Sequence, residues 1–267
     1  MKKGTIGFIG LGNMAKAMIG GMLEKGIVRP EELIGADKSE FAVKEAAERF
    51  HIQTTKDNKE VAQEAEILFL AVKPQFMAEA VAEIKDCITD DILIVSIAAG
   101  KTIGNLTELF GKEIRIVRCM PNTPALVLAG CTGICRNEKV SDDQMGRVTE
   151  LLASFGIASE VPEGLMDAVV GVSGSAPAYV FLFIEAMADG AVAAGMPRKQ
   201  AYEFAAQAVL GSAKMVLETG KHPGELKDMV CSPAGTTIEA VKVLEEKGFR
   251  GIVMDAVEAC VKRSKEM

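Results

Sequence analysis

Residues 5–15 of this chain read Thr-Ile-Gly-Phe-Ile-Gly-Leu-Gly-Asn-Met-Ala, and this stretch decides the fold. A short apolar run leads into the pattern G-x-G-x-x-A, and a helical segment follows. Gly10 permits a tight turn, Gly12 lets the backbone approach a pyrophosphate, and Ala15 allows a helix to pack closely on a strand. The order strand, glycine turn and helix therefore predicts a dinucleotide-binding site rather than a purely structural turn.

An acidic residue follows at the distance that such a site needs. Asp37 lies 22 residues beyond Ala15, at the end of the second predicted strand. A carboxylate there can bind the adenosine ribose hydroxyls of NAD. Lys38 and Ser39 come next, and a cation with a hydroxyl suits the 2′-phosphate of NADP instead. The two signals conflict, so the sequence predicts a nicotinamide cofactor and leaves NADH and NADPH both open.

The first part of the chain alternates short β-rich runs with helical segments such as 16–25 and 41–50. Alternation of this kind indicates a parallel sheet covered on both faces. We therefore predict an α/β fold, with a doubly wound, mainly parallel Rossmann-type sheet over residues 1–162. The expected strands are 5–9, 32–36, 67–72, 92–97 and 114–119, with 130–135 and 156–161 extending one edge.

Residues 163–267 are predicted to form an all-helical second domain, because the strand pattern ends there. Pro197 and Pro223 mark helix starts, and Gly195, Gly220 and Gly248 follow helix ends. Residues 179–188 and 201–216 are apolar around much of the helix circumference, which predicts burial against a second subunit. The expected helices are 177–194, 197–219, 223–230, 238–247 and 252–265.

Composition narrows the class of protein. The chain has 267 residues and a net charge of −7, without a basic stripe, which argues against nucleic-acid binding. Its six cysteines form no CxxC pair and there are two histidines, so we expect no metal site. Reduced thiols and the absence of a signal-peptide pattern favour the cytoplasm. The most apolar helix, 176–188, is interrupted by Glu185 and reads as too short to span a membrane.

The junction between two predicted helices, residues 226–238, carries the second chemical signal. Thr236 followed by Glu239 resembles a capping box, and Pro233 and Gly235 form the preceding turn. Free N–H groups at such a helix start attract a carboxylate or phosphate. Thr237 then has a hydroxyl free to contact a ligand. A plain loop with a good helix cap is the simpler alternative.

Both ends together resemble the pyrroline-5-carboxylate reductase family, over essentially the whole chain. The most specific match is the 226–238 segment, which has the family form Ser-Pro-x-Gly-x-Thr. Met229 and Ala176 depart from residues common in that family, and Met229 puts one polar cofactor contact in doubt. The other matching stretches are the glycine loop, Ala-Val-Lys-Pro-Gln at 71–75, Ser-Ile-Ala-Ala-Gly at 96–100, Met-Pro-Asn-Thr-Pro at 120–124 and Ser-Gly-Ser-Ala-Pro-Ala-Tyr at 173–179.

The resemblance implies NADPH- or NADH-dependent reduction of 1-pyrroline-5-carboxylate to L-proline by a homodimer joined through the helical domain, possibly in a higher assembly. It implies that the amides of Thr236 and Thr237 hold the carboxylate, with the Thr237 hydroxyl near the ring nitrogen as the catalytic group. Glu163, Ser232 and Gly235 would also line the substrate site. Cofactor contacts are implied at Gly10, Leu11, Gly12, Asn13, Met14, Asp37, Lys38, Ser39, Asn58, Ala71, Val72, Lys73, Pro74, Ala98 and Ala99.

Two other functions fit parts of the sequence. β-Hydroxyacid dehydrogenases have a similar glycine loop, but they carry an acid/base lysine on the first long helix of the second domain. Residues 177–194 of this chain contain no lysine. A non-enzymatic NAD(P)-binding sensor would use the same first domain, yet it would have no need of a carboxylate site at Thr236 and Thr237. The sequence therefore favours the reductase over both alternative functions.

Overall fold

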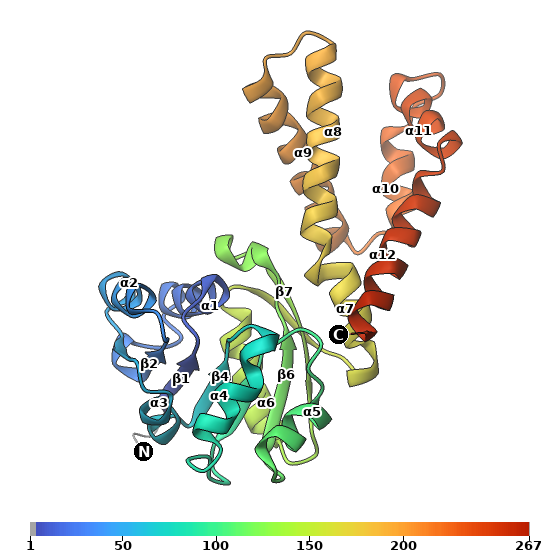
Figure 1. Ribbon diagram of the computed structural model, residues 1–267. Coiled ribbons are helices and arrows are strands. Elements are labelled where there is room, and N and C mark those ends of the chain that lie inside the picture. The colour runs from blue at the N-terminus through green and yellow to red at the C-terminus, as the bar shows by residue number, and fades with distance from the viewer. Residues whose placement is uncertain (1–3, 267) are drawn as a thin grey trace. The chain divides into compact units, whose positions relative to one another are not determined.

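The computed structural model describes residues 4–266, and the chain divides into two compact units. Unit 1 comprises Met1–Ser175 with Cys260–Met267, and unit 2 comprises Ala176–Ala259. Figure 1 shows a sheet with surrounding helices in the first unit and helices alone in the second. Packing thus keeps 163–175 with the sheet, although the sequence pattern changes at 162. The domain boundary at 162/163 stays a prediction.

A large sheet forms the centre of unit 1. Its strands are β1 (Ile6–Ile9), β2 (Leu33–Ala36), β3 (Gln53–Thr55), β4 (Ile67–Leu70), β5 (Leu93–Ser96), β6 (Arg115–Met120), β7 (Gly130–Arg136) and β8 (Gly156–Glu160). Their spatial order is β3-β2-β1-β4-β5-β6-β7-β8. Among these strands the β6–β7 pair is antiparallel and the others are parallel. The predicted doubly wound, mainly parallel fold is confirmed, and its strand order reverses between β1 and β4, where such folds bind their ligands.

The sequence did not predict β3. This strand has three residues, Gln-Thr-Thr, which are exposed or half-buried at the edge of the sheet. A polar edge strand lacks the continuous apolar run that marks a strand buried on both faces. It is held by pairing with β2, whose four residues are all buried. The edge strand therefore depends on its neighbour and not on its own pattern.

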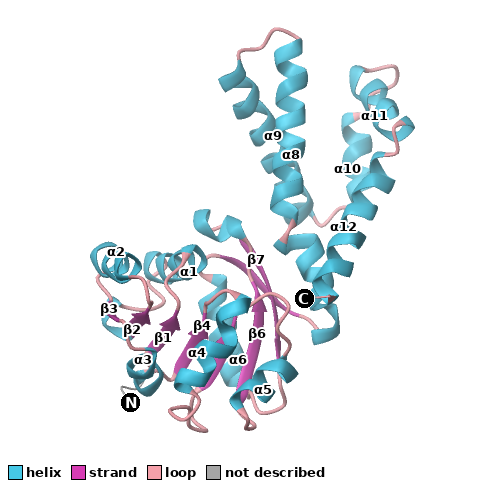
Figure 2. Cartoon of the chain, viewed as in Figure 1, coloured by secondary structure: helices cyan, strands magenta, loops and turns pink. Residues whose placement is uncertain are grey.

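Helices cover both faces of the sheet, as Figure 2 shows. Helices α1 (Asn13–Glu24), α2 (Glu40–Phe50) and α6 (Asp142–Ala153) share one apolar core. Helices α3 (Asn58–Glu64), α4 (Met77–Ile84) and α5 (Ile103–Phe110) share the other. Phe8 of β1 and Phe69 of β4 stack with ring centroids 4.7 Å apart. The two central strands and the glycine loop after β1 therefore rest on a rigid core.

Two buried cysteines lie in the antiparallel strand pair, Cys119 in β6 and Cys135 in β7. Burial raises the pKa of the Cys119 thiol well above its usual range, and burial raises the pKa of Cys135 to about 11. At about pH 8 only on the order of a thousandth of Cys135 is thiolate, so we expect alkylation at least about a hundred-fold slower than for a free thiol. Mass spectrometry after iodoacetamide treatment of the native protein checks this. Rapid labelling of both residues without unfolding would contradict it.

Unit 2 is helical. Its helices are α8 (Ala176–Ala193), α9 (Arg198–Thr219), α10 (Pro223–Val230), α11 (Thr236–Glu246) and most of α12 (Phe249–Lys265), whose last turns belong to unit 1. Helices α8 and α9 pack side by side around Ala188, Ala201 and Ala205. Gly220 ends α9 in the left-handed conformation, with φ of 63°, as a C-cap glycine does. The predicted helices are confirmed with ends shifted by up to three residues.

The first helix of the second half is longer than the sequence indicated. Residues Glu163–Ala193 form one helical run of 31 residues with mean hydropathy 1.5, long and apolar enough to cross a membrane by length and composition. The prediction that this helix is too short is therefore wrong. The run includes α7 (Met166–Val169) and a π-helical turn at Val170–Gly174. The helical conformation therefore begins well before residue 177, where the sequence predicts the helix start. Such a run also occurs in subunit contacts, and only 6% of its apolar window is buried within the chain.

Candidate active site

The glycine loop sits at the carboxyl end of β1. Gly10 has a φ of +95°, and a Cβ there would lie 2.7 Å from the carbonyl oxygen of Ala71 at the end of the neighbouring strand. Gly12 is the N-cap of α1, and a Cβ there would meet no atom within 4 Å among the described residues. No described side chain caps this helix. Gly10 is thus required by the turn, whereas Gly12 leaves open space in front of the first amides of α1.

A cavity of about 440 Å³ opens beside this loop. Its volume is typical of a small-molecule site. The uncapped N-terminus of α1 supplies N–H groups that suit a pyrophosphate, so the residues present fit a dinucleotide. Nine of the predicted cofactor residues line the cavity: Gly10, Gly12, Asp37, Lys38, Ser39, Asn58, Ala71, Val72 and Lys73. Leu11, Asn13, Met14, Pro74, Ala98 and Ala99 are not part of its lining, and their cofactor contacts stay predictions.

Asp37 links the second strand to the glycine loop. Its Oδ2 accepts a hydrogen bond from the Leu11 N–H at 2.8 Å, and its Oδ1 accepts one from the Ser39 N–H at 2.8 Å. A carboxylate oxygen has more than one acceptor site, so each can still receive a ribose hydroxyl. Asp37 therefore orients the loop in addition to lining the cavity.

Lys38, Ser39 and Asn58 are already engaged by neighbouring groups. The Ser39 hydroxyl caps α2 by accepting from the Ala42 N–H at 3.4 Å. Lys38 pairs with Glu79 and Glu83 of α4, and the Asn58 amide donates to Glu83. Each of these three side chains therefore already has a hydrogen-bond or ion-pair partner within the protein.

Sequence reasoning missed Ile9, Phe76, Glu79 and Ala80, which also line the cavity. Phe76 lies in the 3₁₀ turn Pro74–Phe76, and Glu79 and Ala80 lie in α4. The signal that could have found Glu79 was the spacing of Glu79 and Glu83, which places both carboxylates on one face of a helix. These carboxylates contact Lys38, which follows β2, only in the folded chain, so no local pattern indicated them.

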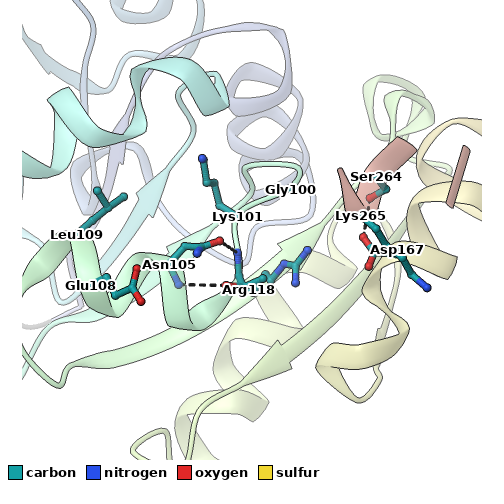
Figure 3. A pocket seen from close by; sticks show the side chains of 10 residues that line it. Gly100, Lys101, Asn105, Glu108, Leu109, Arg118, Asp167, Ser264 and Lys265 are labelled. Atoms are coloured by element: carbon teal, nitrogen blue, oxygen red, sulfur yellow. Dashed lines mark hydrogen bonds between the residues drawn. The ribbon is translucent and has the colours of Figure 1, made fainter. Parts of the chain in front are cut away.

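A second cavity, of about 570 Å³, lies within unit 1 (Figure 3). It lies where the loop after β5, strand β6, α7 and the last turn of α12 come together. Ser264 donates a hydrogen bond to Asp167 at 2.6 Å, which fixes the end of α12 on α7. Its lining residues are Gly100, Lys101, Thr102, Asn105, Glu108, Leu109, Arg118, Asp167, Ser264 and Lys265.

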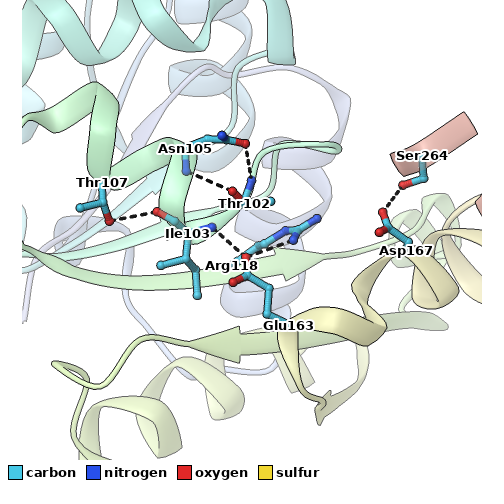
Figure 4. Close-up of polar contacts among 8 residues, drawn as sticks. All are labelled: Thr102, Ile103, Asn105, Thr107, Arg118, Glu163, Asp167 and Ser264. Carbon is cyan, nitrogen blue, oxygen red and sulfur yellow. Dashed lines mark hydrogen bonds and ion pairs between the residues drawn. The ribbon is translucent and has the colours of Figure 1, made fainter. Parts of the chain in front are cut away.

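Glu163 takes part in a structural contact of unit 1. Its Oε1 accepts from the Ile103 N–H at 2.8 Å, at the start of α5, and lies 3.2 Å from Nη1 of Arg118 (Figure 4). Arg118 is only 5% exposed, so Glu163 neutralises a buried cation. Thr102 and Asn105 close the same helix start by a reciprocal capping box. The predicted substrate contact of Glu163 stays a prediction, and its resolved partners are those of a positioning group.

The junction between α10 and α11 corrects one prediction. Helix α11 begins at Thr236 with Gly235 as its N-cap and no side-chain hydrogen bond to the cap. Thr236 is therefore the first helical residue and not the cap, and the expected Thr236–Glu239 capping box is absent from this helix start. The turn Ser232–Gly235 closes by a hydrogen bond from the Gly235 N–H to the Ser232 carbonyl at 3.0 Å. The helix therefore begins at Thr236, one residue earlier than it would if Thr236 were the N-cap.

The uncapped start of α11 is compatible with the anion site that the sequence predicts. An uncapped helix start leaves its first N–H groups free of side-chain partners, which is the arrangement that binds a carboxylate. Thr237 is half-buried at the second helical position. A Cβ at Gly235 would come within 2.3 Å of the Ser232 hydroxyl oxygen, so this hydroxyl is held close to the helix start. Ser232, Gly235, Thr236 and Thr237 are thus brought together, while their contacts with substrate stay predictions.

The turn carries backbone strain at Ala234, which has a φ of +54°. Left-handed backbone is unfavourable for a residue with a Cβ. We expect Ala234→Gly to stabilise the protein by about 0.5–1 kcal/mol, because relief of strain exceeds the entropy that glycine adds to the unfolded chain. Urea unfolding at fixed protein concentration measures it. Ala240→Gly inside α11 is the matched control and should destabilise by about 1 kcal/mol; equal losses in both variants would contradict strain at Ala234.

Other polar residues have structural partners. His222 caps α10 by accepting from the Gly224 N–H at 3.0 Å, and Asp189 pairs with Arg198 at 2.5 Å between α8 and α9. Among the described residues no group of three metal-binding side chains comes together.

The doubly wound sheet and the glycine-loop cavity define an NAD(P)-dependent oxidoreductase. Residues 5–100 match the family model described as "NADP oxidoreductase coenzyme F420-dependent", and residues 163–267 match the one described as "Pyrroline-5-carboxylate reductase dimerisation". Among curated relatives, a pyrroline-5-carboxylate reductase of Escherichia coli is 53% identical over 98% of this chain and 97% of its own. One from Methanosarcina acetivorans is 46% identical over 100% and 99%.

Two solved structures similar to this chain belong to the same family as its curated relatives. A pyrroline-5-carboxylate reductase from Coxiella burnetii superposes with a TM-score of 0.93 at 37% identity, covering 99% of this chain and 98% of that one. A Plasmodium falciparum pyrroline carboxylate reductase with NADP bound gives 0.89 at 34% identity, covering 100% and 98%. The chain belongs to the pyrroline-5-carboxylate reductase family. The β-hydroxyacid dehydrogenase and sensor alternatives are therefore set aside.

Proposed function

We propose that this protein reduces the C=N bond of 1-pyrroline-5-carboxylate to give L-proline, with NADPH or NADH as reductant. The observation that carries the proposal is full-length identity of about half to relatives of that name, together with an uncapped α11 start bearing Thr237. A carboxylate-bearing cyclic imine matches these groups, because helix-start amides bind the carboxylate and a hydroxyl can contact the ring nitrogen.

The chemistry needs few polar groups from the protein. The bound nicotinamide supplies a hydride at its C4 atom. A cyclic imine near neutral pH can already carry a proton on nitrogen, so no strong acid has to deliver one to a developing alkoxide. The amides of Thr236 and Thr237 hold the substrate carboxylate, and the Thr237 hydroxyl orients the ring nitrogen. The contribution of these residues is placement and electrostatics.

The cofactor site is proposed on unit 1. The amides at the start of α1, from Gly12 to Met14, bind the pyrophosphate, and Asp37 and Asn58 lie along the adenosine side. The loops after β4 and β5, which contain Ala71–Pro74 and Ala98-Ala99, lie along the nicotinamide half. Gly10 serves this site indirectly, because it allows the loop to turn against Ala71.

We also propose a homodimer formed through the helical half, with higher assemblies of dimers possible. The support is the dimerisation family model over residues 163–267 and the many large apolar side chains that unit 2 leaves exposed. Phe181, Leu182, Phe204 and Leu217 are each more than half exposed within the chain. A net charge of −7 argues against nucleic-acid binding, and free thiols at all six cysteines support a cytoplasmic enzyme.

Oligomeric state tests the dimer directly. Size-exclusion chromatography with light scattering is expected to give twice the 28.4 kDa of one chain, or an even multiple, at micromolar concentration. Phe181→Glu and Leu182→Glu together place charges on the exposed apolar face and should shift the mass towards one chain. A wild-type protein that elutes as a monomer would contradict the dimer.

The reaction is tested by following the label. Reduced cofactor deuterated at C4 and 1-pyrroline-5-carboxylate are incubated with the enzyme, and the product is analysed by mass spectrometry and NMR. Proline with one deuterium on the former C=N carbon is expected. Cofactor oxidation without labelled proline would overturn the proposed reaction.

A further inference from the structure

Lys38, at the adenosine end of the 440 Å³ cavity, is tied to helix α4. Its Nζ lies 2.5 Å from Oε1 of Glu79 and 3.0 Å from Oε1 of Glu83. The hydrogen bonds to Glu79 and Glu83 raise the pKa of Lys38, and the bond to Lys38 lowers the pKa of Glu83. The ammonium group of Lys38 is therefore already neutralised by carboxylates.

Glu83 is fixed in this place by a buried side chain. Asn58 is only 6% exposed, and its Nδ2 donates to Oε2 of Glu83 at 2.5 Å. One carboxylate oxygen of Glu83 thus faces Asn58 and the other faces Lys38. Glu83 is not part of the cavity lining, but it contacts two residues that are, Asn58 and Lys38, and its side chain is 37% exposed.

The charge balance at this end is negative. Asp37, Glu79 and Glu83 contribute three carboxylates, Lys38 contributes one ammonium, and Lys73, which follows β4, contributes the other ammonium of the cavity lining. A 2′-phosphate carries about two negative charges near neutral pH. Two of the three N–H groups of Lys38 already face the glutamates, so a phosphate bound to the third would have to lie beside both carboxylates. A ribose 2′-hydroxyl carries no charge and can donate to Asp37.

We propose that Glu79 and Glu83 are specificity-determining residues that make this enzyme favour NADH over NADPH. They act by repelling a 2′-phosphate and by neutralising the charge of Lys38, so the discrimination comes from weakening the competing cofactor. The proposal deepens the cofactor use stated above and rests on it. It concerns binding at the adenosine end and is independent of which substrate the enzyme reduces.

Isothermal titration calorimetry without imine substrate tests the proposal on the full-length protein. NADH should bind the wild-type protein more tightly than NADPH does. Glu79→Gln and Glu83→Gln should each tighten NADPH binding by about three- to ten-fold and change NADH binding by less than about two-fold, because partly exposed charges interact modestly. The gain should shrink between about 50 mM and about 500 mM salt, because mobile ions screen the repulsion.

Glu138→Gln is the matched control, since it removes an equal charge from an exposed turn between β7 and α6. It should leave the ratio of the two dissociation constants unchanged. A merely structural role for Glu79 and Glu83 would lower thermal stability and weaken both cofactors alike, which overturns the proposal. Tighter binding of NADPH than NADH by the wild-type protein overturns it as well. Failure of the reductase assay with intact cofactor selectivity would instead reject the proposed reaction alone.

Discussion

Thr237→Ala is expected to lower kcat/KM for 1-pyrroline-5-carboxylate by about ten- to a thousand-fold, the range usual for loss of one positioned polar contact. Thr237 is a half-buried residue at the second position of an uncapped helix, next to the amides proposed to hold the carboxylate. Steady-state kinetics at saturating reduced cofactor measure the effect.

Two further variants separate the hydroxyl from the shape of the side chain. Thr237→Ser retains the hydroxyl and should recover most of the activity, whereas Thr237→Val keeps the shape and should not. Thr89→Ala removes a hydroxyl from an exposed turn before β5 and serves as the matched control. Unchanged kcat/KM in Thr237→Ala would reject the catalytic assignment.

Glu163→Ala is expected to destabilise the protein by about 2–3 kcal/mol, because it leaves the buried Arg118 guanidinium and the Ile103 N–H without this acceptor. The figure is below that of a fully buried pair because the Glu163 side chain is 36% exposed. Urea unfolding at constant protein concentration measures it.

An exposed ion pair provides the control for this prediction, and a double variant tests whether the buried charge causes the loss of stability. Glu150→Ala breaks the exposed Arg147–Glu150 pair and should cost less than about 1 kcal/mol. Arg118→Met combined with Glu163→Ala should lose less stability than the two single changes added together, because no buried charge is then left unpaired. A Glu163→Ala protein of normal stability with a raised KM for the imine would favour the substrate contact implied by family resemblance.

The part of the site that local sequence could predict is the part built from consecutive residues. Gly10, Gly12 and Asp37 are recognisable because a tight turn, a close backbone approach and a strand end each restrict the residue type. The alternation of strands and helices likewise predicted the sheet. Strand β3 was missed because its three polar residues are defined by their pairing with β2.

Contacts between distant segments could not be predicted in this way. Glu79 lies 41 residues from Lys38, and Glu163 lies 45 residues from Arg118. Each pair is in contact only through the tertiary fold. The capping prediction at Thr236 failed for a different reason. Thr236 and Glu239 have the spacing of a capping box, but the turn at Ser232–Gly235 makes Gly235 the N-cap, so the helix begins one residue earlier than a threonine cap requires.

The central claim is that this chain is a reductase for a cyclic imine, and substrate-dependent oxidation of the reduced cofactor tests it most directly. The absorbance of NADH and of NADPH is followed with 1-pyrroline-5-carboxylate and, in parallel, with hydroxyisobutyrate semialdehyde. Oxidation is expected with the imine and not with the semialdehyde. Failure to oxidise either cofactor with the imine, or a preference for the semialdehyde, would contradict the account.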